Sequence, residues 1–298
     1  MKIINIGSLN IDRIYGVEHF VQPGETIKVR TYSEACGGKG LNQSIAAARS
    51  GAEVHHAGAV GSDGGMLLEI LRISGVHTGK TKILSGASGH AVIQVDKNGQ
   101  NNIMICGGAN DAVSMGMIDD ALREISEGDI VFSEWISNVG YAVEQAKKAG
   151  AKIALNPSPV NENLKTIPMD LIDYFILNEI EGKEISSAES EEPETIMGKL
   201  KEKYPKAAFV LTLGEKGSWY FDETRCFKQE IYKVKAVDTT AAGDTFCGYF
   251  LSGLTKGKEI PEILKTASAA SAIAVSRSGA APSIPTYEEV EKFMAERS

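Results

Sequence analysis

Cysteine and histidine are scarce in this sequence, and neither is spaced for a metal centre or a disulfide framework. The four cysteines contain no C-x-x-C pair, and the five histidines contain no H-x-x-x-H motif. The sequence therefore argues against a Cys/His metal site and against a disulfide-bonded fold. We expect four free, buried thiols: Cys36, Cys106, Cys226 and Cys247.

Positive charge and long apolar runs are also lacking. The chain has 31 Lys and Arg against 39 Asp and Glu, a net charge of -8, so no basic stripe is available for nucleic acid or an anionic membrane. No apolar run is long enough to span a bilayer, and the N-terminal MKIINIGSLN is typical of a strand entering a glycine turn, not of a signal peptide. We expect a cytoplasmic protein with no nucleic-acid or membrane partner, in which any phosphate site is local.

Short apolar segments that alternate with helical ones are abundant. With 298 residues, 43% of them hydrophobic, the chain can bury one large core. The alternation is typical of an α/β fold with a doubly wound, mostly parallel sheet covered by helices. We expect strands at 2–6, 53–59, 130–133, 152–155, 174–177 and 208–213, and helices at 42–50, 64–74, 119–125, 139–149, 194–203 and 287–297.

Two segments break the alternation and predict a small separate sheet. Residues 11–35 alternate around Pro23-Gly24, and residues 90–106 alternate around Asn98-Gly99, a strong hairpin signal. The expected organisation is an α/β core of residues 1–10, 36–89 and 107–298 with a β lid of residues 11–35 and 90–106. Because so small a sheet exposes its edges, we expect a homodimer formed through the lid.

The most informative stretch is VDTTAAGDTFCG at residues 237–248, which predicts a helix that starts at small residues. Thr239 and Thr240 can cap this helix. Three residues would leave their backbone N–H groups open and form an anion hole for a phosphoryl group: Ala241, Ala242 and Gly243. A carboxylate beside such a hole suggests that Asp244 is a base that takes a proton from an attacking hydroxyl. The alternative is that Asp244 merely favours the first helical turn.

A second stretch, CGGKGLN at residues 36–42, predicts a glycine-rich turn before another helix. Its glycines, including Gly38, would let a ligand approach the backbone, and Asn42 could offer an amide to hydroxyl groups. The loop matches neither the G-x-x-x-x-G-K-[ST] nor the G-x-G-x-x-G pattern, and a tight strand-to-helix turn would explain it equally well.

Taken together, these stretches resemble the ribokinase family of carbohydrate kinases. The resemblance covers nearly the whole chain, with motifs in the family order: GSLNID (7–12), PGET (23–26), GGKGLN (37–42), LNPSP (155–159), LNEIE (177–181), LTLGEKG (211–217), VDTTAAGDTF (237–246) and AIAVSRSGAAPSIP (272–285). It implies a three-layer fold with a lid over the sugar, and ATP-dependent phosphorylation of a sugar hydroxyl. PGET, GGKG and SRSGAAPSIP are closest to members that phosphorylate D-ribose at its 5-hydroxyl.

Short carboxylates, amides and one lysine would hold the sugar hydroxyls, since such groups accept and donate hydrogen bonds in pairs. The residues and the resemblance point to the same positions: Asn10, Asp12, Gly38, Lys39, Asn42, Glu134 and Asp244. Asn10 and Asp12 could instead be plain turn formers, and Lys39 a solvated charge. Around Glu134 the segment FSEWISN departs from the pattern of related enzymes.

Nucleotide binding would use the ends of two strands and a helix. Asn178 and Glu181 form N-x-x-E after a strand and could hold Mg²⁺ through water. Thr212 and Gly214 end another strand, where open α/β sheets bind ligands. Adenine would lie against the small-residue helix 267–274, near Ser271, with the phosphates near Gly243.

The resemblance also implies a monovalent-cation loop, occupied by K⁺, that would stiffen the anion hole. Its ligands would be backbone oxygens together with the Ser283 side chain: Asp238, Thr240, Ala274, Arg277 and Gly279.

Two other functions stay open. A nucleoside kinase would need an aromatic stacking partner near the lid, for which the sequence offers Tyr15, Phe20, Tyr32 and Trp135. Kinases of other small sugars use the same scaffold. A non-catalytic sugar-binding protein is the alternative from a different class, although an intact base and anion hole argue against it.

Overall fold

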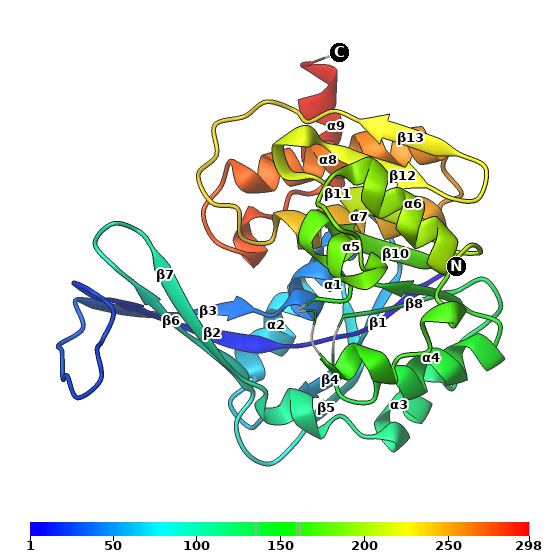
Figure 1. The fold of residues 1–298 in the computed structure, drawn as a ribbon. Helices are drawn as coiled ribbons and strands as arrows, with labels where there is room; N and C mark the ends of the chain where they lie inside the picture. Colours follow the sequence, from blue (N-terminus) through cyan, green and yellow to red (C-terminus); the bar gives the residue numbers. More distant parts are fainter. Residues whose placement is uncertain (135, 159, 161, 298) are drawn as a thin grey trace.

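The computed structural model describes residues 1–134, 136–158, 160 and 162–297, and it shows three layers with a sheet between two sets of helices (Figure 1). The main sheet has the strand order β13-β12-β11-β10-β9-β8-β1-β4-β5. The strands from β11 to β5 pair in parallel, whereas β12 and β13 are antiparallel. The bounds are β1 Ile3–Ile6, β4 Val54–Val60, β5 His77–Ile83, β8 Ile130–Ser133, β9 Lys152–Leu155, β10 Tyr174–Asn178, β11 Ala208–Thr212, β12 Ser218–Phe221 and β13 Cys226–Gln229.

Both faces of the main sheet are covered because successive strand side chains point to opposite sides. Ile3 packs in the cluster that contains α1, α2, α7, α8 and α9, whereas Ile4 packs in the cluster of α3 to α6. The three-layer, doubly wound α/β fold is therefore confirmed. The helices are α1 Lys39–Arg49, α2 Gly65–Ile73, α3 Met115–Leu122, α4 Val139–Lys148, α5 Glu179–Ser186, α6 Pro193–Lys203, α7 Ala242–Thr255, α8 Ile260–Val275 and α9 Tyr287–Ala295.

All six expected strands are present, but three strands of the main sheet were missed. β5 is rich in polar residues, and β12 and β13 form a short antiparallel hairpin outside the strand–helix alternation. Three helices begin earlier than expected, α6 by one residue, at Pro193, and α1 and α3 by more. α3 starts at Met115 because the hydroxyl of Ser114 accepts a hydrogen bond from the N–H of Met117, and α1 starts at Lys39.

A second sheet with the order β3-β2-β6-β7 projects from the body, as expected for the two alternating segments (Figure 1). β2 pairs antiparallel with β3 and parallel with β6, and β6 and β7 form the Asn-Gly hairpin, in which Gly99 has a φ of 78°. Every residue of β7 is exposed. The bounds are β2 Asn10–Gly16, β3 Thr31–Gly37, β6 Gly89–Val95 and β7 Asn101–Cys106.

The thiols are free, but the expectation that all are buried was wrong. Cys247 is buried, Cys36 is half-buried, and Cys106 and Cys226 are exposed. The two exposed thiols lie on β7 and β13, each the last strand at one edge of its sheet. Within the described residues, no helix is both long and apolar enough to cross a bilayer. The cytoplasmic location stays a prediction.

Candidate active site

Asp244 lies in the first turn of α7 and is buried. The helix begins after Ala241, which adopts a left-handed conformation with a φ of 60°. The expected caps were wrong: neither Thr239 nor Thr240 caps α7, because the cap position falls on Ala241, which has no side-chain oxygen. The helix N-terminus therefore keeps the partial positive charge of its unsatisfied amides.

Two amides at this N-terminus are unpaired. In the described part of the chain, the N–H groups of Gly243 and Asp244 donate no hydrogen bond. Ala242 differs from the expectation, because its N–H closes a turn onto the carbonyl of Thr239 at 3.2 Å. A Cβ atom built on Gly243 would meet no atom within 4 Å, so there is open space beside this amide. An anion can approach the helix end at Gly243.

The carboxylate of Asp244 is held by three residues on one face of α1. Asn42 Nδ2 donates to Oδ2 at 3.1 Å, and Gln43 Nε2 donates to Oδ1 at 3.0 Å. Lys39 Nζ lies 3.7 Å from Oδ1. These residues stand at positions i, i+3 and i+4, which share one helix face. The negative charge of Asp244 raises the pKa of Lys39 above its usual range, although burial opposes this.

A glycine allows α1 and α7 to come this close. A Cβ atom on Gly248 would lie 2.5 Å from the backbone nitrogen of Ala47 and 2.8 Å from the carbonyl oxygen of Gln43. Any side chain at Gly248 would therefore push the two helices apart. The contact between Asp244 and α1 depends on this packing.

Glu134 follows β8 and is buried, with its Oε1 aimed at two turns of the chain. It accepts hydrogen bonds from Ser8 N at 2.6 Å, from the Ser8 hydroxyl, and from Gly40 N at 2.7 Å. Burial raises the pKa of this carboxyl group. A Cβ atom on Gly40 would lie 2.5 Å from the carbonyl carbon of Gly7, so the turns meet backbone to backbone. Glu134 thus joins the first glycine turn to the start of α1.

Asn10 and Asp12 lie on β2, where the second sheet meets the core. Asn10 Oδ1 accepts a hydrogen bond from Asn110 Nδ2 at 2.9 Å. The carboxylate of Asp12 lies over Gly37, where an added Cβ would be 2.1 Å from Oδ2. Burial raises the pKa of Asp12 to about 6. Gly38, with a φ of 100°, ends the strand and starts α1.

Asn178 and Glu181 form a capping box at the start of α5. Asn178 Oδ1 accepts from Glu181 N at 2.8 Å, and Glu181 Oε2 accepts from Asn178 N at 3.0 Å. The N-x-x-E motif therefore has a structural role of its own. Among the described residues, Glu181 Oε1 has no hydrogen-bond partner, and no group of three or more His, Cys, Asp or Glu side chains could hold a metal.

The remaining nucleotide candidates lie at two places. Thr212 ends β11, and its hydroxyl donates a hydrogen bond to the carbonyl of Leu177 at 3.1 Å. Gly214 lies two residues later and has a φ of 53°. Ser271 lies on α8, and its hydroxyl donates to the carbonyl of Ala242 at 3.0 Å. Ser271 therefore supports the first turn of α7.

The expected cation loop is a pair of chain segments linked by hydrogen bonds. Asp238 accepts from Thr240 N and from Gly279 N, each at 2.9 Å. Burial would raise the pKa of Asp238, but these bonds lower it below its ordinary value. Ser283 is buried and its hydroxyl donates to Ala280 O at 2.7 Å. The backbone N–H of Arg277 donates to Ala274 O at 3.0 Å.

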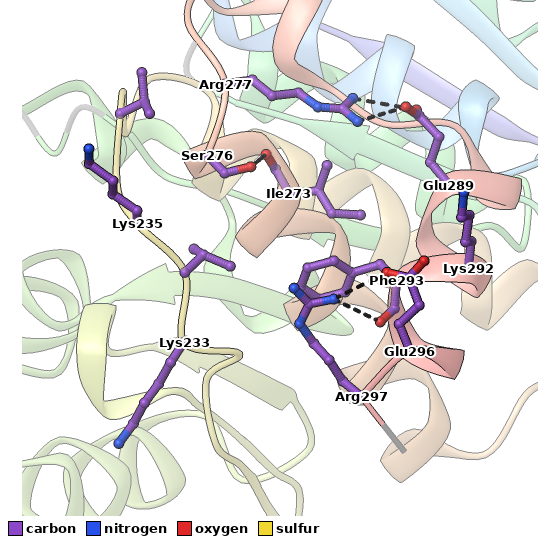
Figure 2. A pocket seen from close by; sticks show the side chains of 12 residues that line it. Lys233, Lys235, Ile273, Ser276, Arg277, Glu289, Lys292, Phe293, Glu296 and Arg297 are labelled. Carbon is purple, nitrogen blue, oxygen red and sulfur yellow. Dashed lines mark hydrogen bonds and ion pairs between the residues drawn. The ribbon is translucent and has the colours of Figure 1, made fainter.

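A pocket of about 790 Å³ opens beside this loop, between residues 233–237 and α9 (Figure 2). Arg277 crosses its upper end and forms an ion pair with Glu289 at 2.6 Å. Phe293 lines the opposite wall, with the guanidinium of Arg297 3.8 Å from its ring centre. Its lining contains neither Asp244 nor any expected sugar-binding residue. This pocket is therefore separate from Asp244.

Of the aromatic candidates for base stacking, Tyr15 and Tyr32 lie together on the second sheet, with ring centres 5.0 Å apart. Trp135 lies outside the described residues, as does Pro159 of the LNPSP motif.

Sequence reasoning missed three buried amide residues: Gln43, Asn110 and Asn156. Gln43 follows directly after the GGKGLN motif, so its position beside Asn42 on a helix was the available signal. Asn156 lies in the LNPSP motif, which marked its segment but gave it no role, and Asn110 carried no signal, since its partner Asn10 lies far away in the sequence.

Known proteins resemble the chain over nearly its full length. A family model described as pfkB family carbohydrate kinase matches residues 1–287. The chain is 35% identical to ribokinase from Haemophilus influenzae, over 97% of each chain. The structure of ribokinase from Thermotoga maritima has a TM-score of 0.88 at 35% identity, with 99% of each chain covered. Ribokinase from Arabidopsis thaliana complexed with ribose and ATP has a TM-score of 0.85 at 28% identity, with 98% of each chain covered.

Proposed function

Because the chain belongs to the pfkB family of carbohydrate kinases, a family of phosphotransferases with an alcohol acceptor, we propose that it phosphorylates D-ribose at the 5-hydroxyl with ATP. One observation carries the proposal: the buried carboxylate of Asp244 lies at a helix N-terminus whose Gly243 amide is unpaired and faces open space. Asp244 takes the proton from the attacking hydroxyl, and the amides of Ala241 and Gly243 stabilise charge on the transferred phosphoryl group.

The sugar is bound between the second sheet and the start of α1. Asn10 and Asp12 contribute from β2, and the turn at Gly38 lets the sugar approach the backbone. Lys39, Asn42 and Glu134 complete the set. Asn42 and Glu134 also hold the site together, because each already bonds to protein groups beside the sugar position.

ATP would lie along the ends of β10 and β11, with Thr212 and Gly214 near the nucleotide and Ser271 supporting the phosphate-binding turn. Mg²⁺ would supply charge neutralisation on the phosphates. The donor set fits such an ion, since Glu181 offers one carboxylate oxygen and Mg²⁺ commonly binds through one or two carboxylates, waters and substrate phosphates.

A K⁺ ion would be held by the backbone oxygens of the cation loop and by the Ser283 hydroxyl. Neutral oxygen donors from two segments fit a monovalent cation, and both segments are linked to the start of α7 through Asp238. The ion would keep the anion hole in one geometry.

The same proposal divides the chain into the core and lid given above, with the lid closing over the sugar. Two copies would pair through the lid. The exposed apolar side chains of β7 support this pairing: Ile103, Met104 and Ile105 are 50%, 53% and 69% exposed.

A coupled assay of ADP release across pentoses, hexoses, deoxy sugars and nucleosides tests the substrate. We expect the highest kcat/KM with D-ribose. A higher value with another sugar would replace ribose by that sugar. A preference for nucleosides would favour a nucleoside kinase, a function that the neighbouring rings of Tyr15 and Tyr32 support as a stacking surface for the base. Sugar binding without any phosphoryl transfer would favour a non-catalytic binding protein.

A further inference from the structure

A line of buried polar side chains connects Asp244 to the N-x-x-E motif. Gln43 Nε2 donates to Asp244 Oδ1 at 3.0 Å and to Asn156 Oδ1 at 3.3 Å. Asn156 Nδ2 in turn donates to Glu181 Oε2 at 3.5 Å and to the carbonyl of Ile176 at 2.9 Å. The line starts at the proposed base and ends at the proposed Mg²⁺ side of the site.

The donors in this line are fully used. An amide nitrogen has two N–H groups, and both amide nitrogens here have two acceptors. Turning the Gln43 amide over would place its oxygen against the Asp244 carboxylate and the Asn156 oxygen, which also only accept. The orientation of Gln43 is therefore determined by its neighbours.

These side chains are buried, so water does not replace a lost partner. The exposed fractions are 1% for Gln43 and 6% each for Asn156, Glu181 and Asp244. Gln43 Oε1 and Asn42 Oδ1 are buried without any hydrogen-bond partner in the described chain. Keeping two unpaired carbonyl oxygens beside Asp244 costs free energy, which indicates that the N–H groups are placed for the carboxylate.

We propose that Gln43 is a positioning residue that sets the orientation of the Asp244 carboxylate and, through Asn156, ties it to Glu181. The proposal rests on the function proposed above. In it, the base and the Mg²⁺ side of the site move as one unit. Gln43 satisfies both of its donors only when Asp244 and Asn156 are in place, and Asn156 satisfies both of its donors only when Glu181 and the carbonyl of Ile176 are in place.

The first test is steady-state kinetics of Gln43→Met, which keeps the volume of the side chain and removes its donors. We expect kcat to fall about 10- to 100-fold, because a displacement of the base by up to about 1 Å reduces the rate by this order. The KM values for sugar and ATP should stay within about threefold, because the buried Gln43 amide donates both of its N–H groups to protein partners. An unchanged kcat in the folded variant would overturn the proposal.

The link through Asn156 is tested by a double-mutant cycle. Gln43→Met and Asn156→Leu both break the same line, so the double variant should be no slower than the slower single variant. If the losses of kcat in the two single variants multiply in the double variant, Gln43 and Asn156 act independently, and the link to Glu181 is overturned. Ser50→Ala is the matched control, since Ser50 is buried near the end of α1 and, among the described residues, its hydroxyl bonds only to Ala47 O.

Two further measurements keep the test independent of folding and of the substrate assignment. Gln43→Glu retains size and shape but faces Asp244 with an oxygen, so it should lose at least as much kcat; normal activity would contradict the proposal. In a crystal structure of Gln43→Met, we expect the Asp244 carboxylate to turn toward Lys39, so that their ion pair becomes shorter than 3.7 Å. An unmoved carboxylate would refute positioning by Gln43 even if the wild-type protein phosphorylates no sugar tested.

Discussion

Asn42 Nδ2 donates a hydrogen bond to Asp244 Oδ2 at 3.1 Å, although 202 residues separate them in the chain. This contact joins the two glycine-rich stretches of the sequence into one site. Both oxygens of the carboxylate accept hydrogen bonds from consecutive residues of α1. At the start of α7, beside the carboxylate, the N–H group of Gly243 has no partner among the described residues. In the proposed reaction, a carboxylate held at both oxygens needs no reorientation before it accepts the proton.

Asp244→Asn should lower kcat by about 10²- to 10⁴-fold with sugar binding largely retained, because the amide is not a base. The structure adds a second effect. The new amide nitrogen would face the N–H group of Asn42 or Gln43, so some loss of stability is expected. Kinetics and thermal unfolding should be measured together. Activity within a few-fold of wild type would remove Asp244 as the base.

Gly243→Val should abolish turnover while leaving the fold intact. Apart from its chain neighbours and its own helix backbone, no atom of the described residues lies within 4 Å of the added Cβ, so the valine would fit the fold and would occupy the space that the proposed function gives to the phosphoryl group. Circular dichroism checks the fold. Gly198→Val is the matched control, because Gly198 also lies on a helix with open space around its Cβ and is far from Asp244 in the sequence. Turnover by folded Gly243→Val would mean that the amide does not face the phosphate.

The KM for the sugar should fall as pH rises through about 6, because burial raises the pKa of Asp12 to about 6 and only its ionised carboxylate would accept hydrogen bonds from the sugar hydroxyls in the proposed site. The raised pKa of Asp12 also makes the stability of the fold depend on pH, and stability falls as pH rises. The folded protein binds this proton more tightly than the unfolded chain, so the Asp12 contribution to stability is present below about pH 4 and is lost toward pH 6. Asp12→Asn should remove both dependences; a persisting pH dependence of KM would assign it to another group.

Exchanging sodium or Tris for potassium at constant ionic strength and saturating Mg-ATP should raise the initial rate several-fold. Ser283→Ala should weaken this activation because it removes one oxygen ligand. Arg277→Ala is the matched control, since it keeps the backbone oxygen and removes only the ion pair with Glu289. A rate that ignores the cation, together with a silent Ser283→Ala, would make the loop purely structural.

Light scattering should show a dimer at micromolar concentration. Ile105→Glu should shift it toward monomer, because the exposed apolar face of β7 would then carry charge. Ile73→Glu offers a matched control, as Ile73 on α2 is 69% exposed, the same fraction as Ile105. A wild-type monomer, or equal effects of the two variants, would contradict pairing through the lid.

The alternation of strands and helices, the Asn-Gly hairpin and the helix start at Asp244 could be predicted because each depends on residues close together in the chain. The edge strands β12 and β13 could not, since they lie outside the alternating pattern. The N-x-x-E motif shows a different limit. The same two residues fit both a metal site and the cap of α5, and the pattern alone does not distinguish these roles. The structure shows the cap.

The sequence by itself determined the order of the layers, the small second sheet and the residue types available for catalysis, because periodicity and turn residues act over a few positions. Only the tertiary structure decided which of those residues meet. Lys39, Asn42 and Gln43 reach Asp244 because one face of α1 turns toward α7, and the backbone contact at Gly248 sets how closely they approach. That contact joins segments some 200 residues apart, and it exists only once both helices have packed on the same face of the sheet.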